Sequence, residues 1–183
     1  RDKLVTGVQT CALPILVIAS CGDTATVEAL AAVTVLKKLL PKLNVRFVNV
    51  VDLMKLVSNK SHPHGLTDSE FNKLFTLSKP IIFNFHGYPT LIHQLVYNRH
   101  NRNLHVSGYS EEGTITTSFD MCALNKTDRY DLVLKAIKYL DLPKEKTEEV
   151  ARFCKSKLKE NSEYIRKYGV DMPEIADWNW NDK

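Results

Sequence analysis

The sequence has 183 residues, of which 44% are hydrophobic and 25% are charged, a composition that suits one globular domain and excludes disordered, collagen-like and disulfide-dense proteins. Its 25 basic and 21 acidic residues leave a formal net charge of +4, and this small, dispersed excess gives no reason to expect a nucleic-acid partner. The 4 cysteines form no CxxC pair and no stretch is apolar enough to cross a membrane, so we expect a cytoplasmic protein without a membrane partner.

The start of the chain differs in kind from the rest. Residues 5–15 (VTGVQTCALPI) resemble the in-frame translation of a common sequencing-library adapter. A competing interpretation is a secretory signal, because Arg1 and Lys3 precede the apolar run 11–19 and residues 18–21 (IASC) look like a lipoprotein cleavage site. The adapter match is the more specific of the two. We therefore predict that residues 1–15 are adapter-derived or otherwise non-native and that residues 16–183 form one domain.

A strand followed by a helix opens this domain. The β-branched run 16–20 predicts the strand, and Asp23 is expected to cap the helix that follows. Apolar residues at helical spacing, Val27 among them, predict that the helix covers residues 24–40 and turns this stripe to the core. Pro41 ends the pattern.

The middle of the chain repeats the alternation. Strands are predicted over 45–51, 81–85 and 104–107, with a short helix or turn over 52–56 and helices over 67–77 and 90–98. Thr67 and Glu70 form a capping box. His62 and His64 lie in a predicted loop without the Cys or carboxylate neighbours of a metal site. Because strands that alternate with helices make parallel sheets with right-handed crossovers, we predict a three-layer α/β sandwich around a mostly parallel open sheet.

Additional helices and a docked tail are predicted for the C-terminal third. Residues 128–140 carry an apolar face, and residues 145–168 form a longer, charged helix with a narrow apolar stripe. Gly169 fits the left-handed position after its last turn. The tail 171–180 has no period but contains two Trp, so we expect it to pack against the domain.

Residues that follow the strands are the candidate contacts, because ligands of an open parallel sheet bind beyond the carboxyl ends of its strands. His86 follows a buried strand, Gly87 permits close backbone approach and Tyr88 adds a phenol, a set that could bind an anion or transfer a proton. The simpler interpretation is that His86 only hydrogen-bonds a loop carbonyl. No GxGxxG, P-loop or GxSxG motif occurs. We assign no catalytic, cofactor or metal residue, and the candidate inter-domain or ligand contacts are His86, Gly87, Tyr88, His93, Glu111 and Glu112.

Several segments in collinear order resemble the C-terminal domain of phosphoketolase. They are spread from about residue 16 to residue 180 and comprise 45–54, 62–66, 79–83, 85–89, 104–106, 111–114, 119–121 and 171–175. The resemblance implies a fold like the transketolase C-terminal domain, with additional C-terminal helices. It also implies a parent enzyme of three α/β domains that forms a homodimer.

The resemblance further implies an aldehyde-lyase of carbohydrate metabolism. Such an enzyme uses thiamine diphosphate and a divalent metal, Mg²⁺, to cleave xylulose 5-phosphate, and often fructose 6-phosphate, with phosphate into acetyl phosphate and an aldose phosphate. In this family the cofactor and metal residues belong to the two upstream domains. This domain is therefore expected to bind no cofactor alone, to support the dimer, the architecture or regulation, and to be inactive by itself.

The sequence departs from the family pattern at two positions. Cys122 and Ser118 stand where Arg and often Pro are expected in many relatives. If such an Arg contacts a phosphate or a partner domain, this chain lacks that contact.

The residues also leave a second interpretation open, a free-standing binding module that keeps the fold and senses a phosphorylated metabolite. Intact thiamine-binding domains encoded in frame upstream of Leu16 would favour the enzyme domain. A genuine start codon there would favour the free-standing module.

Overall fold

A parallel four-stranded sheet forms the centre of the protein. The computed structural model describes residues 15–180, so the predicted adapter-like segment lies outside the described residues except for Ile15. The strands are β1 (Leu16–Cys21), β2 (Val45–Asn49), β3 (Ile81–Phe85) and β4 (Leu104–Ser107). They lie in the order β2-β1-β3-β4, and each neighbouring pair is parallel. The predicted α/β class with an open parallel sheet is confirmed.

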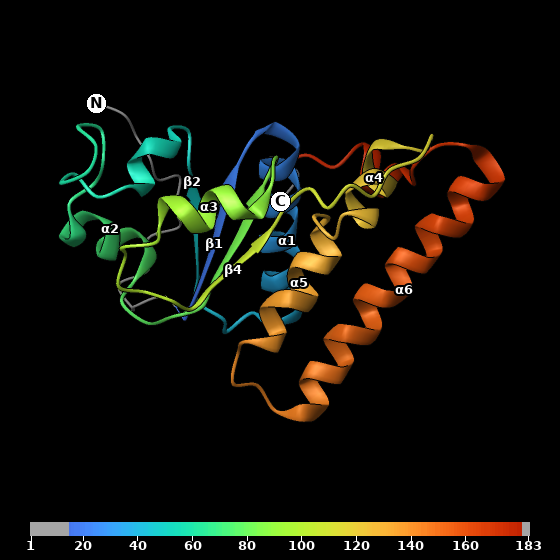
Figure 1. Cartoon of the computed structure of the whole chain (residues 1–183). Helices are drawn as coiled ribbons and strands as arrows, with labels where there is room; N and C mark the ends of the chain where they lie inside the picture. Colours follow the sequence, from blue (N-terminus) through green and yellow to red (C-terminus); the bar gives the residue numbers. More distant parts are fainter. Residues whose placement is uncertain (1–14, 181–183) are drawn as a thin grey trace.

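Helices cover both faces of the sheet. One face carries α1 (Asp23–Leu39) and α5 (Arg129–Lys138), and the other carries η1 (Leu53–Leu56), α2 (Asp68–Phe75) and α3 (Pro89–Leu95). The long helix α6 (Lys144–Tyr168) packs on α5 and is the outermost element on its side (Figure 1). Two short helices complete the chain, α4 (Ser118–Leu124) and α7 (Pro173–Ala176).

The strand β1 shows how the core is divided. Successive side chains of a strand point to opposite faces, so Leu16 and Ile18 join the cluster under α1 and α5, whereas Val17 and Ala19 join the cluster under η1, α2 and α3. All four side chains are fully buried. A central strand that is apolar on both faces is what a three-layer sandwich requires.

The face that α1 turns to the core is wider than the predicted stripe and leaves out one of its residues. Val27 is 44% exposed, whereas Ala25, Ala29, Ala32 and Leu36 are buried. Small alanine side chains let α1 lie close to both the sheet and α5. Of the predicted stripe, Ala31 is buried and Leu30, Val35 and Leu39 pack partly buried against the core, so the prediction was wrong only at Val27.

The helix ends follow their sequence signals with one exception. The capping box is present, with Glu70 N donating to Thr67 Oγ1 at 3.2 Å and Thr67 N donating to the Glu70 carboxylate at 2.9 Å. Gly169 follows α6 with the left-handed φ of 73°. Asp23, in contrast, does not cap α1, because Gly22 occupies the N-cap position with φ 104° and the helix has no side-chain cap. The chain turns one residue earlier than predicted.

The tail packs on the domain, as predicted. Ile175 of α7 is buried, and the Trp178 ring centroid lies 5.4 Å from the guanidinium carbon of Arg129. The Thr117 hydroxyl donates to the Asp171 carboxylate at 2.6 Å, which ties the tail to the start of α4. In the part of the chain that the structure describes, no helix is long and apolar enough to cross a membrane.

Candidate functional site

A cavity of about 390 Å³ lies at the carboxyl end of the sheet. Its walls come from the start of α1 (24–25), the end of β3 and the loop after it (85–87), Tyr109 after β4, and residues between 116 and 127. The neighbouring strands β1 and β3 lead into helices on opposite faces. Ligands of open α/β sheets bind at such a crevice. The fold thus places the predicted contacts 86 and 87 in the wall of a suitable cavity.

His86 is positioned by the backbone of the neighbouring strand. Its N–H donates to the Cys21 carbonyl at 3.0 Å, which continues the contact between β1 and β3. A Cβ on Gly22 would lie 2.4 Å from the His86 Cβ, so only glycine lets the turn after β1 pass so close. The imidazole is exposed and makes no hydrogen bond to any described residue. The simpler interpretation, an imidazole bonded to a loop carbonyl, is therefore wrong.

Two buried amides hold the walls of the cavity together. Asn84 Nδ2 donates to the carbonyls of Ala25 at 3.1 Å and Thr127 at 2.8 Å. Asn125 Oδ1 accepts hydrogen bonds from the N–H and the hydroxyl of Ser110 at 2.9 and 3.1 Å. These bonds join segments that are far apart in the sequence, so the shape of the cavity is fixed by the folded protein itself.

The predicted contacts Tyr88 and Glu111 meet beside the cavity. The Tyr88 hydroxyl donates a hydrogen bond to the Glu111 carboxylate, and this bond raises the pKa of Tyr88. The Tyr88 ring also lies edge-on to Tyr109, with 5.6 Å between the centroids. Glu112 accepts from Asn125 Nδ2 through its backbone carbonyl, at 2.8 Å. The loop after β4 brings these residues together, but Tyr88, Glu111 and Glu112 do not line the cavity.

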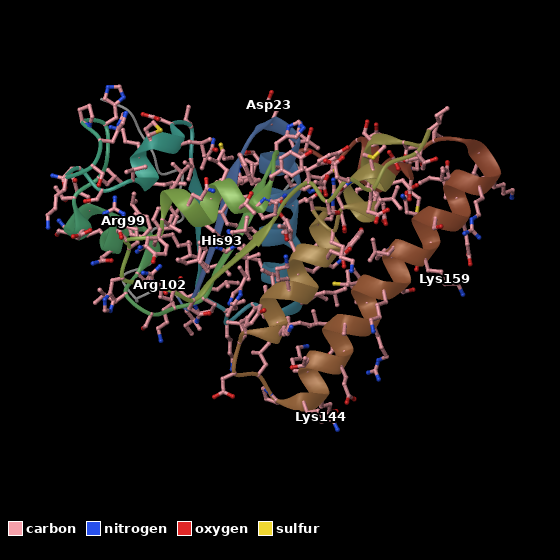
Figure 2. The ribbon with its side chains drawn as sticks, in the orientation of Figure 1. Asp23, His93, Arg99, Arg102, Lys144 and Lys159 are labelled. Carbon is pink, nitrogen blue, oxygen red and sulfur yellow. The ribbon has the colours of Figure 1, made fainter. Side chains whose placement is uncertain are left out.

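His93, the remaining predicted contact, lies elsewhere. It is exposed on α3, well away from Asp23, which marks the start of α1 beside the cavity (Figure 2). It lies near His105, whose pKa is lowered by burial and then by the charges of Lys135 and Lys138. The structure does not bring His93 and His86 into one site.

The walls of the cavity carry neutral hydrogen-bonding groups. No Asp or Glu side chain lines it, and the polar side chains include the hydroxyls of Thr24 and Ser118. Cys122 also lines it, and burial, followed by the charge of Glu28, raises the pKa of this thiol to about 11. Because the thiolate is the nucleophilic form, this raised pKa lowers the nucleophilic reactivity of Cys122 at neutral pH. The arrangement suits binding better than covalent chemistry.

Sequence reasoning missed the wall that α4 contributes. Thr117 caps this helix by accepting from Asp120 N at 3.3 Å, and a Thr three residues before an Asp is a start signal that the sequence did contain. The helix places Ser118 and Cys122 in the cavity wall. Both departures from the expected family pattern therefore border the same cavity.

Comparison with known proteins decides the family. The model of the XFP C-terminal domain family matches residues 6–180. A probable phosphoketolase of Clostridium acetobutylicum is 55% identical over 168 residues, which is 92% of this chain and 21% of that protein. Probable phosphoketolases of Bradyrhizobium diazoefficiens and Chlorobaculum tepidum are 53% and 51% identical, over 93% and 92% of this chain and 21% and 22% of their own lengths. The chain belongs to the family of phosphoketolase C-terminal domains.

This phosphoketolase C-terminal domain spans about a fifth of the length of the curated relatives it matches. Within residues 15–180, no three His, Cys, Asp or Glu side chains come together in a way that could hold a metal ion.

Proposed function

We propose that this chain works as the C-terminal domain of a cytoplasmic, thiamine-diphosphate-dependent phosphoketolase. The whole enzyme cleaves xylulose 5-phosphate or fructose 6-phosphate with phosphate, and gives acetyl phosphate and an aldose phosphate. The observation that carries this proposal is an identity of 51–55% over more than nine-tenths of the chain to probable phosphoketolases.

Within that enzyme we assign the domain a supporting role in the homodimer, the architecture or regulation. Thiamine diphosphate, when bound, supplies the nucleophilic carbon that cleaves the ketose, and the protein must hold its diphosphate, its metal and its aminopyrimidine. The chain covers only 21% of the length of its relatives, which supports a cofactor site in the remaining part of the enzyme.

Acetyl phosphate formation, trapped as the hydroxamate, tests the proposal. The assay contains xylulose 5-phosphate, phosphate, thiamine diphosphate and Mg²⁺. We expect product from the full-length protein encoded at the same locus and none from the 183-residue chain. Turnover by the chain alone would overturn the supporting role. An inactive, correctly folded full-length protein would overturn the phosphoketolase assignment.

A further inference from the structure

We propose that the cavity at the carboxyl end of β1 and β3 binds a small organic phosphate, through donors on Thr24, His86 and Ser118 and through the apolar side chains of the same walls. This inference goes beyond the proposed function, because it concerns a ligand of this chain alone and not the reaction of the parent enzyme.

The size and construction of the cavity suit a small molecule. Its volume of about 390 Å³ falls within the range of small-ligand sites and is too small for a folded partner. Phe85, Tyr109 and Met121 supply apolar surface that can cover the carbon skeleton of a ligand. The amide of Asn84, which is fully buried, joins two of the walls. A site that is rigid before the ligand arrives loses less entropy on binding.

Some hydrogen-bond donors in the walls are bonded to other groups of the protein, and others are not. Thr116 and Thr117 each donate a hydroxyl hydrogen bond of 2.6 Å to a carboxylate of the protein. The hydroxyls of Thr24 and Ser118 and the imidazole of His86 have no hydrogen-bond partner among residues 15–180. Three solvent-exposed groups from separate parts of the chain thus line one cavity without a hydrogen-bond partner in the described residues.

Among residues 15–180, no carboxylate lines the cavity, although the charge of Glu28 acts on Cys122 in its wall. The nearby carboxylates of Glu111 and Asp120 accept hydrogen bonds from tyrosine and threonine hydroxyls and do not line the cavity. The first turn of the 17-residue helix α1 does line it, and Gly22 offers no side chain to satisfy the N–H groups there. Those N–H groups carry the positive end of the helix dipole. The Asp23 carboxylate in this turn is exposed and is not part of the walls.

The number of donors favours a phosphoryl group over a carboxylate. A phosphate monoester presents three terminal oxygens, all strong acceptors, and carries close to two negative charges at neutral pH. A carboxylate presents two oxygens and one charge. Two hydroxyls, an imidazole and the N–H groups of the first turn of α1 form a set of donors that a phosphoryl group can use more fully.

Titration of the ¹⁵N-labelled 183-residue chain with phenyl phosphate, followed by amide chemical shifts, tests the proposal. The probe joins a phosphoryl group to an apolar ring, and inorganic phosphate, benzoate and phenol are titrated separately. We expect saturable shifts at residues 24, 25, 87 and 118, and an affinity for phenyl phosphate at least about fivefold above that for each other probe, the equivalent of about 1 kcal/mol. Equal affinity for benzoate or phenol would overturn the phosphate assignment, and equal affinity for inorganic phosphate would overturn the organic one.

Single substitutions locate the binding within the cavity. Ser118→Ala and His86→Gln should each weaken phenyl phosphate binding at least about threefold, the loss expected for one hydrogen bond to a charged group. His93→Gln, an exposed imidazole outside the cavity, should leave the affinity unchanged. Ser118→Ala removes one exposed oxygen, so it keeps the test valid if His86→Gln fails to fold. Shifts that do not saturate, or that respond equally to His93→Gln, would overturn the site whatever the acetyl phosphate assay gives.

Discussion

Among residues 15–180, each face of the sheet buries one arginine, and the two arginines are neutralised in different ways. On the α1 and α5 face, Arg129 Nη2 lies 2.7 Å from Glu28 Oε1, and the two side chains are 4% and 6% exposed. On the α2 and α3 face, Arg99 is 1% exposed, but its carboxylate partner Asp68, at 2.7 Å, is 60% exposed. The remaining donors of Arg99 bind the backbone carbonyls of Leu56, Val57 and Leu66.

This difference shows two ways of keeping a guanidinium out of water. Glu28 also accepts from the Arg129 backbone N–H at 2.8 Å, so a full charge pair fastens the start of α5 to α1. Arg99 instead donates hydrogen bonds to backbone carbonyls of a loop. The dipoles of these carbonyls offset much of the cost of burying its positive charge. Loss of the counter-charge should therefore destabilise the protein more at Arg129, which depends on one buried carboxylate, than at Arg99.

Glu28→Gln is expected to have the largest effect. The amide keeps the size of the side chain but leaves the Arg129 guanidinium buried without its counter-charge, which costs about 3–5 kcal/mol of unfolding free energy. Urea denaturation followed by circular dichroism measures this loss. Glu148→Gln is the matched control, because Glu148 forms an exposed pair with Lys144 on α6, and it should cost less than about 0.5 kcal/mol. Equal losses in the two variants would show that water compensates Arg129.

Arg99→Met comes next. Methionine keeps an apolar contact with Phe71, whose ring centroid lies 4.4 Å from the guanidinium carbon, but the loop 57–66 loses its donors. We expect a loss of about 2–4 kcal/mol and faster tryptic cleavage after Lys60 in that loop. Arg102→Met, which removes an exposed arginine, is the control. An unchanged cleavage rate at Lys60 would show that Arg99 does not hold the loop.

The ion pairs of the two arginines could not be predicted from the sequence, unlike the local features of the fold. The strand 81–85 and the capping box at Thr67 were predicted correctly because apolar runs and caps are local signals. Glu28 and Arg129 are 101 residues apart in the chain. A single carboxylate within a helix carries no periodic signal that it is buried, so the pair could not be found without the tertiary structure.

The candidate site was also predicted only in part from the sequence. His86 and Gly87 were identified because they follow a buried strand, and the structure places both in the cavity wall. The wall made by α4 was missed, since this helix has seven residues and its position depends on the bond between Thr117 and Asp171, 54 residues apart. Local patterns thus located the edge of the sheet, and long-range contacts closed the cavity.

Asp68→Asn sharpens the comparison between the two faces. It removes the same kind of counter-charge as Glu28→Gln, but from an exposed position, and Arg99 keeps its carbonyl partners. We expect a loss of at most about 1 kcal/mol, which high salt should abolish because exposed pairs are screened. The loss in Glu28→Gln should persist in high salt. Urea denaturation at low and high salt measures both losses. A salt-independent loss in Asp68→Asn would show that the Arg99–Asp68 pair is shielded from salt as the Arg129–Glu28 pair is.

The charge of Asp128 decides whether Glu28 is the sole negative charge that neutralises Arg129 among the described residues. Its Oδ1 accepts from the N–H groups of Tyr130 at 2.8 Å and Asp131 at 3.1 Å. Its Oδ2 is buried and has no hydrogen-bond partner within the described residues. Burial, and then the charge of Asp131, holds the pKa of Asp128 well above its usual range. When this carboxyl binds a proton, it adds no counter-charge beside Arg129.

Asp128→Asn is expected to have the smallest effect at acidic pH, because Asn caps a helix as well as Asp does. The pKa of Asp128 is higher in the folded state, so the stability gained from its proton is complete below the unfolded pKa of about 3.9 and is lost as the pH rises through the folded pKa. The variant should therefore gain stability relative to the wild type as the pH rises above about 4. Urea denaturation across this range measures the difference. Parallel curves would mean that Asp128 ionises normally, in which case Arg129 has two carboxylates and Glu28→Gln should cost less than predicted.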